Sequence, residues 1–186
     1  GGAPRERTFR DRALETPPPL QAGLGGSGPL PVSTQLISAV AADSLTVSNC
    51  TVRNGGAKGL QVAHSTGISI SQSVFFDFGA SAIETAVTDD AVVSDCRIGR
   101  PGQVWQQGVG ASFGHCTNAS VTRCELFEHP SDGVCFSGVG LVHKNTLSHS
   151  LLRDFGATAQ RPLNETISDW GGVHTAHVSA ETVGLG

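Results

Sequence analysis

From residue 43 onward, apolar positions recur in a fixed order and are separated by polar ones. Each copy has apolar residues at its third and eighth positions and Cys or Ser at its sixth, as in Val47, Val52 and Cys50. The first position is also apolar in four copies, as in Leu45, and is Asn145 in the fifth. A period of two is typical of β-strands rather than helices. The Cys or Ser positions are 23, 23, 28 and 26 residues apart, at Cys50, Ser73, Cys96, Cys124 and Ser150.

A second short apolar segment follows each copy. Self-similarity at this period is the signature of a solenoid, whose units must stack because one unit has too little apolar surface to fold alone. We therefore predict an all-β fold, a right-handed single-stranded parallel β-helix of about five rungs over residues 43–186, truncated at its C-terminus. The second segments are Leu60–Val62, Ile83–Thr85, Val109–Ala111, Val134–Phe136 and Val173–Thr175.

Residues 1–42 lack the repeat. A mixed-charge run over 5–15 allows one short helix, three prolines follow at 17–19, and 23–31 is rich in Gly and Pro. We expect this segment to be an irregular, flexible tail.

The repeat places the Cys and Ser residues in one inward column, as a ladder of small buried side chains. The polar residues just before them should point outward. Five cysteines with no close CxxC pair favour neither a zinc site nor a disulfide framework. The histidines form no HxH or HExxH spacing, and we expect no metal and no cofactor.

Composition narrows the function classes. The 186-residue chain begins with Gly and contains no Met, so we expect a fragment or a processed piece. A formal net charge of −4 disfavours nucleic acid as a partner. No apolar run approaches the roughly 18 residues of a membrane span, and we expect no membrane partner.

The turn that joins the two segments of each copy varies in length. It takes eight positions in the first, second and fourth copies, 11 in the third (98–109) and 21 in the fifth (152–173). Insertions in solenoids form loops on one face, often the binding face. We therefore predict a binding groove, with two walls about 10 Å apart over a low floor.

The two tryptophans, Trp105 and Trp170, fall in these two insertions. An exposed aromatic ring can stack on the apolar face of a sugar, which makes both residues candidates for substrate binding. The alternative is that each tryptophan pins its own loop to the solenoid, and the sequence leaves both open.

Carboxylates also gather at these turns. Glycoside hydrolysis needs two carboxyl groups across the scissile bond, one protonated and one ionised, although an acidic solvated edge would have the same composition. We take Glu128 and Asp132 as candidates for substrate binding. His174, predicted to point outward beside the fifth insertion, is a further candidate, with a solvated strand residue as the alternative. The carboxylates are Glu128, Asp132, Asp154, Glu165 and Asp169.

Several stretches in this order resemble glycoside hydrolase family 141, whose members are right-handed parallel β-helix enzymes of the pectate-lyase-like class. The most specific is Ile167-Ser168-Asp169-Trp170-Gly171-Gly172-Val173-His174-Thr175, with Trp170 and His174 in place of the family's usual Met and Tyr. The resemblance covers roughly residues 43–186. The stretches that carry it are residues 108–115, Asn118, Val121, 132–134, 145–147 and 167–175.

The resemblance implies a carbohydrate-active enzyme on plant-type polysaccharides, of the α-L-fucosidase or xylan-cleaving class, with Asp169 as the catalytic carboxylate. The family's further acidic motif is expected beyond Gly186, so the chain would lack part of its catalytic pair. By analogy we expect an extracellular or secretory location and a monomer at full length. A β-helix that only binds glycan and a polysaccharide lyase on the same fold remain alternatives.

Overall fold

Every regular element in the described part of the chain is a β-strand. The computed structural model describes residues 35–138, 144–155, 172–176 and 183–185. These residues contain no helix with the length and apolar character to cross a membrane. In chain order the strands are β1 (Ile37–Val40), β2 (Thr46–Ser48), β3 (Thr51–Gly55), β4 (Leu60–Ser71), β5 (Val74–Phe78), β6 (Ile83–Ser94), β7 (Arg97–Gly99), β8 (Ala111–Gly114), β9 (Ser120–Thr122), β10 (Glu125–His129), β11 (Val134–Ser137), β12 (Asn145–Ser148), β13 (Leu151–Phe155), β14 (Val173–Ala176) and β15 (Val183–Leu185).

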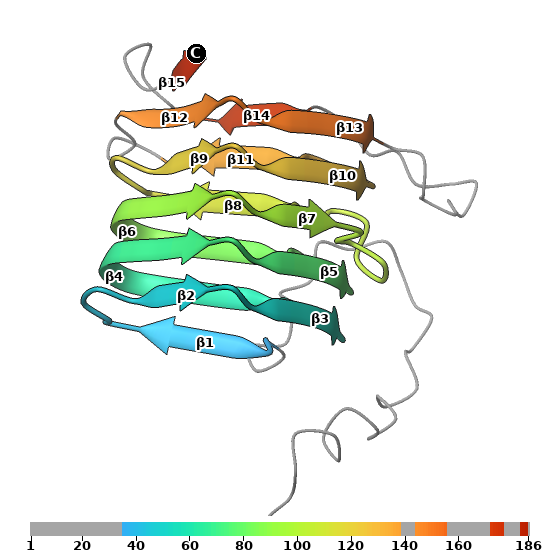
Figure 1. The fold of residues 1–186 in the computed structure, drawn as a ribbon, viewed down its shortest axis with the longest axis horizontal. Helices are drawn as coiled ribbons and strands as arrows, with labels where there is room; N and C mark the ends of the chain where they lie inside the picture. Colours follow the sequence, from blue (N-terminus) through green and yellow to red (C-terminus); the bar gives the residue numbers. More distant parts are fainter. Residues whose placement is uncertain (1–34, 139–143, 156–171, 177–182, 186) are drawn as a thin grey trace, which may run out of the picture.

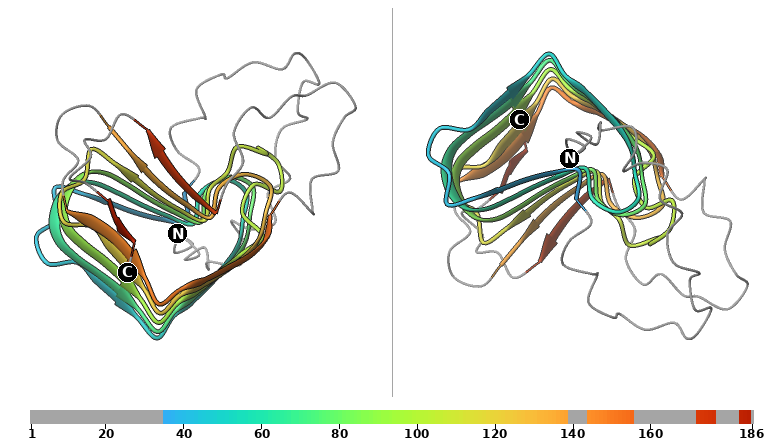
Figure 2. Two further views of the ribbon diagram at one scale, coloured as in Figure 1. Left: turned by 90° about the horizontal axis from the view of Figure 1, so that it is seen from above. Right: turned by 90° about the horizontal axis from the view of Figure 1, so that it is seen from below.

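The strands pair in parallel and stack into a coil with three faces (Figure 1, Figure 2). We number the faces in the order in which the chain runs through them. The first face holds β1, the beginnings of β4 and β6, β8, β11 and β14. The second holds β2, the ends of β4 and β6, β9, β12 and β15. The third is a separate sheet of β3, β5, β7, β10 and β13. The described residues therefore form the predicted parallel β-helix of about five turns.

Each complete turn has three strand segments where the sequence pattern indicated two. The apparent first strand of the repeat is split by a corner between the second and third faces. The polar residue just before each Cys or Ser has a φ of 49–54° and is exposed, as predicted. One residue in this left-handed region turns the chain without a glycine. The five corner residues are Asn49, Gln72, Asp95, Arg123 and His149.

Apolar side chains from all three faces fill the interior of the coil. Phe75, Phe78, Phe113 and Phe136 are among the largest fully buried side chains. Phe113 and Phe136 lie in register on β8 and β11, and their rings stack with centroids 5.3 Å apart. Burying such a side chain stabilises the fold by about 1.5–3 kcal/mol. Because these contacts join neighbouring turns, the stack is stable where a single repeat is not.

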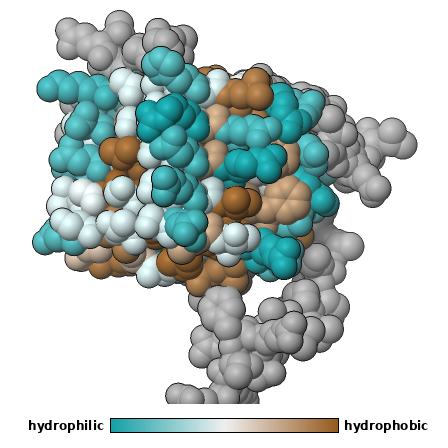
Figure 3. Space-filling view, viewed as in Figure 1, coloured by the Kyte–Doolittle hydropathy of each residue, from teal (hydrophilic) through white to brown (hydrophobic). Residues whose placement is uncertain are grey.

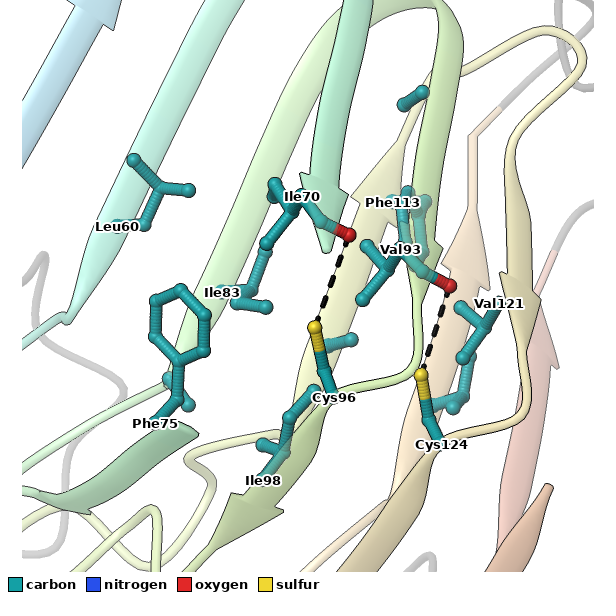
Figure 4. Packing of buried hydrophobic residues seen from close by; sticks show 14 of the residues in the cluster. Leu60, Ile70, Phe75, Ile83, Val93, Cys96, Ile98, Phe113, Val121 and Cys124 are labelled. Carbon is teal, nitrogen blue, oxygen red and sulfur yellow. Dashed lines mark hydrogen bonds between the residues drawn. The ribbon is translucent and has the colours of Figure 1, made fainter. Parts of the chain in front are cut away.

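The predicted inward column of Cys and Ser lies at the corner between the second and third faces. Cys96 and Cys124 are buried in it, whereas Cys50 in the first turn is exposed. The thiol of Cys96 donates to the carbonyl oxygen of Ile70 (3.7 Å), and that of Cys124 to Val93 (3.6 Å), as Figure 4 shows. The column therefore links successive turns of the coil as well as filling the corner.

The outer surface of the third face carries an aromatic ring held between two arginines. Phe127 lies over Gly99, where an added methyl group would be 2.5 Å from the ring atom Cζ. The guanidinium carbons of Arg97 and Arg153 lie 5.4 and 4.8 Å from the ring centroid. Glu125 accepts a 2.7 Å hydrogen bond from each arginine. These groups satisfy one another, so we assign the cluster a structural role.

Candidate functional site

The candidate site lies on the turns that connect the third face to the first, which we call the turn edge. Each of these turns begins with a residue whose φ is 51–61°, so the chain leaves the third face sharply. The turns end where the first-face strands begin, which brings side chains from successive turns into register at one edge. The residues that begin the turns are Asn54, Asp77, Arg100, Glu128 and Asp154.

The insertion in the third turn folds back onto the second turn. The backbone N–H groups of Val104 and Trp105 both donate to the carbonyl oxygen of Gly79, at 3.0 and 2.7 Å. The half-buried indole of Trp105 lies against Gly79, because a methyl group there would be 3.1 Å from Cζ3. These contacts fit the alternative in which Trp105 pins its own loop. Its role as a surface for sugar stacking stays a prediction.

The fourth turn, predicted to form a low floor, is largely buried. His129 has no exposed surface, and Ser131 and Asp132 are 7% exposed. The third turn packs against it, since a methyl group on Gly102 would overlap the ring of Pro130. Polar groups on this turn are thus held in a largely desolvated place, where their charges interact more strongly than in water.

His129 packs its imidazole against the backbone of the third turn. A methyl group on Gly110 would lie 2.7 Å from its Cε1 atom. Burial lowers the pKa of His129 to about 4, and the hydrogen bond to the backbone of Leu126 offsets only part of that effect. The side chain is therefore neutral at pH 7 and acts as a packing group.

We expect the buried His129 to lower the free energy of unfolding by about 2 kcal/mol between pH 6.5 and pH 5. The unfolded side chain takes up a proton below its ordinary pKa, whereas the folded one stays neutral down to about pH 4. Stability is therefore complete above pH 6.5 and falls as the pH falls. Urea unfolding at pH 7, 6 and 5 measures the slope. His129→Gln should flatten it, and the exposed-corner control His149→Gln should not; equal slopes in both variants would contradict this account.

Asp132 and His174, two of the predicted substrate-binding residues, are brought together at the turn edge. Strands β11 and β14 pair in register, with Cys135 opposite His174. The Oδ2 atom of Asp132 lies 3.9 Å from Nδ1 of His174, with 10% and 29% of the two side chains exposed. A carboxylate beside an imidazole can orient the ring, which suits proton transfer or hydrogen bonding to a ligand.

Cys135 is a neighbour of this pair that the sequence reasoning missed. It points outward because Val134 and Phe136, on either side of it, are buried in the core. Burial, and next the charge of Asp132, raises the pKa of the Cys135 thiol, so it is neutral at pH 7. The alternation of apolar and other residues along β11 could have predicted that Cys135 points outward. Its proximity to His174 could not be predicted in this way, because it follows from the pairing of β11 with β14, which is far away in the sequence.

Glu128 belongs to a different group of charges. Its Oε2 atom lies 3.8 Å from Nε of Arg100, which in turn lies 3.1 Å from Oδ1 of Asp77. These three residues begin consecutive turns and form a column of alternating charge along the start of the turn edge. The contact with Arg100 gives Glu128 an electrostatic role there, and its proposed contact with substrate stays a prediction.

Two predicted site residues, Asp169 and Trp170, lie outside the described residues, as does most of the fifth insertion. The structure therefore tests neither the catalytic role of Asp169 nor the second wall of the predicted groove. Across the described ranges, no group of three or more His, Cys, Asp or Glu side chains is arranged to hold a metal ion.

Comparison with known proteins identifies the family. The family model described as "Right handed beta helix region" matches residues 36–169. Neither the curated proteins nor the solved structures gave a match. Since the family match spans more than half of the sequence and agrees with the observed coil, this chain belongs to the right-handed β-helix family.

Proposed function

We propose that this chain is part of a carbohydrate-active enzyme, a glycoside hydrolase that acts at the turn edge on a plant-type polysaccharide, of the α-L-fucosidase or xylan-cleaving class. The observation that carries the proposal is the contact between the largely buried Asp132 carboxylate and His174, 3.9 Å apart on adjacent turns. The resemblance of the stretch around Asp169 to glycoside hydrolase family 141 supports the same reading.

The proposed roles follow from what hydrolysis of a glycosidic bond requires. One carboxyl group donates a proton to the leaving oxygen, and another acts as nucleophile or activates water. Asp169 is the candidate for one of these roles. Asp132 and His174 would hold the sugar hydroxyls and fix the orientation of the substrate, with Trp105, Trp170 and Glu128 as further substrate contacts. This chemistry uses side chains alone and needs no cofactor.

The charges at the turn edge favour a hydrolase over a lyase. A lyase needs a basic side chain to remove a proton beside a uronate carboxylate. Lys58, near the start of β4, donates a 2.6 Å hydrogen bond to Glu84, and Arg100 is paired with Asp77 at 3.1 Å. Both cations are thus paired with acidic neighbours. The nearby Asp132 would in addition repel the anionic sugar on which a lyase acts.

Product analysis tests the proposal directly. The intact protein should release oligosaccharides or fucose from a panel of xylans and fucosylated glycans, and each new reducing end should carry one oxygen-18 atom when the reaction runs in labelled water. An unsaturated product that absorbs in the ultraviolet would instead identify a lyase. Retained binding to the panel without any product by mass spectrometry would replace hydrolysis with simple glycan binding.

A further inference from the structure

Two of the buried cysteines lie next to each other on adjacent turns of the coil. Cys96 follows β6 at the corner between the second and third faces, and Cys124 occupies the same corner one turn later. On one side of the pair Ser94 lies opposite Thr122, and on the other the N–H of Glu125 donates to the carbonyl oxygen of Cys96 at 2.9 Å. The two cysteines are therefore stacked on one another, although 28 positions separate them in the sequence.

The two thiols are in contact inside the coil. Side chains in this column point back toward the preceding turn, as shown by Ser73, whose Oγ accepts a 3.1 Å hydrogen bond from the N–H of Cys50. Cys124 follows the same pattern, and its sulfur lies 3.6 Å from the carbonyl oxygen of Val93 on the preceding turn. A hydrogen bond between the two thiols lowers the pKa of Cys96 and raises the pKa of Cys124. Both residues are almost fully buried, with 1% and 3% of their surface exposed.

The stacking of the pair fits a disulfide bond. Equivalent positions on adjacent parallel turns are about 4.8 Å apart, and disulfides join residues whose Cα atoms are about 4.4–6.8 Å apart. The Cβ atoms must approach by a few tenths of an ångström to reach their usual separation of about 3.5–4.5 Å. The sulfur of Cys96 must also turn away from the carbonyl oxygen of Ile70, to which it donates at 3.7 Å (Figure 4). That hydrogen bond is long, so the rotation costs little.

No other two of the five cysteines, all of which lie in the described part of the chain, are placed to form a bond. Cys50 belongs to the same column but is two turns from Cys96, at about 9.6 Å, which exceeds the limit of about 7 Å. Cys116 is buried at a different corner, between β8 and β9, and Cys135 points outward from the first face. The fold therefore selects one of the ten pairs that five cysteines allow.

An ion pair closes the corner outside the two thiols. Asp95 and Arg123, the residues just before the cysteines, are joined by two hydrogen bonds of 2.7 and 2.8 Å between the same two turns. In Figure 3 a column of hydrophilic side chains runs along this corner. Since the thiols behind it are almost fully buried, the folded coil keeps bulky oxidants away from them. A bond between them has to form while the two turns are coming together.

We propose that Cys96 and Cys124 form a disulfide bond that staples the third turn to the fourth when the chain folds under oxidising conditions. The oxidant is a small-molecule disulfide such as oxidised glutathione. One protein thiolate attacks a sulfur of this molecule and releases a glutathione thiolate, and the other then attacks the mixed disulfide and releases the second. Two electrons pass to glutathione, and the two released thiolates take up the two protons of the protein thiols.

The staple joins the two turns that carry most of the described turn edge. The third turn bears the insertion over 98–109, and the fourth bears Asp132. Closing a loop of this length restricts the unfolded chain and so stabilises the fold. Because the Cβ atoms have to be drawn together, the bond should be easier to reduce than an unstrained disulfide. The proposal does not rest on hydrolysis at the turn edge, since it concerns only the buried thiols.

Refolding in a glutathione buffer tests the proposal. The full chain is denatured with a reductant and refolded with reduced and oxidised glutathione, its free thiols are alkylated, and its peptides are mapped without reduction. We expect a bond between Cys96 and Cys124 in most molecules, with the other three cysteines alkylated. Unselective pairing would place this bond in only about one molecule in ten. If refolding yields are low, the chain secreted into an oxidising medium is mapped instead.

The oxidised chain should melt about 8 °C above the same chain in dithiothreitol. Cys96→Ser should lose this difference and remain folded, because serine already occupies the equivalent positions Ser73 and Ser150 of the column. Cys50→Ser, in the same column but in the first turn, is the matched control and should keep the difference. Cys124→Ser takes the place of Cys96→Ser if that variant melts early in both buffers.

Three results would overturn the proposal. The first is alkylation of all five cysteines after refolding, or a mixture of pairs in near-equal amounts. The second is a bond between Cys96 and Cys124 that leaves the melting temperature unchanged, because such a bond would staple nothing. The third is a difference between the two buffers that persists in both Cys96→Ser and Cys124→Ser.

Discussion

Replacing Gly79 by alanine should lower the free energy of unfolding by about 4 kcal/mol, among the larger effects of a single methyl group. The new Cβ atom would overlap the carbonyl oxygen of Gly56, and it would lie 2.8 Å from that residue's carbonyl carbon. It would also lie 3.1 Å from Trp105. The backbone cannot move aside easily, because Gly79 donates to Gly55 and accepts from Val104 and Trp105. The change therefore disturbs two turns and the inserted loop together.

Gly114→Ala is the matched control. A methyl group there would meet the carbonyl oxygen of Thr85 at 3.6 Å and the hydroxyl of Ser137 at 3.9 Å, both ordinary contacts. We expect a change within about 0.5 kcal/mol of zero, since nothing needs to move. Chemical denaturation of both variants measures the difference. Equal stabilities of the two variants would contradict this prediction, because they would show that the second turn can accommodate a methyl group at Gly79.

The repeat could be predicted from sequence because it depends on local alternation. Inward positions such as Phe75 and Val121 are apolar, and the spacing of the Cys and Ser column places successive turns in register. The corners could not be predicted in the same way. They depend on left-handed residues, and here Arg123 and Val87 take that conformation although neither is a residue type that favours it. The stacked turns hold these residues in the left-handed conformation, so the positions of the corners depend on tertiary contacts rather than on the local sequence.

The candidate site was predictable only in part, for a similar reason. Variation in turn length pointed to one edge of the coil, and the structure places Asp132 and His174 3.9 Å apart at that edge. Glu128 sits only four residues before Asp132, yet it faces Arg100 because it begins the turn in a left-handed conformation. Sequence distance along an irregular turn does not say which way a side chain points. In a strand, by contrast, side chains alternate between the two faces, and the outward direction of His174 could therefore be predicted.

Replacing Asp132 by asparagine should lower kcat/KM for the polysaccharide substrate by about 10²-fold, if the turn edge carries out hydrolysis as proposed. Asparagine keeps the size of the side chain but removes the charge that faces Nδ1 of His174 from 3.9 Å. The imidazole then loses its orienting partner. Steady-state kinetics of the wild type and the variant on the same polysaccharide measures the loss.

Two comparisons separate this role from a merely structural one. Asp95→Asn removes an exposed carboxylate at the corner between the second and third faces, and it should leave kcat/KM unchanged. His174→Gln should lose about as much activity as Asp132→Asn, and the double variant should lose little more, because the two side chains act as a unit. Additive losses in the double variant would mean that the two residues act separately. Full activity in both single variants, with folding intact, would remove the pair from the site and leave Asp169 to be tested on its own.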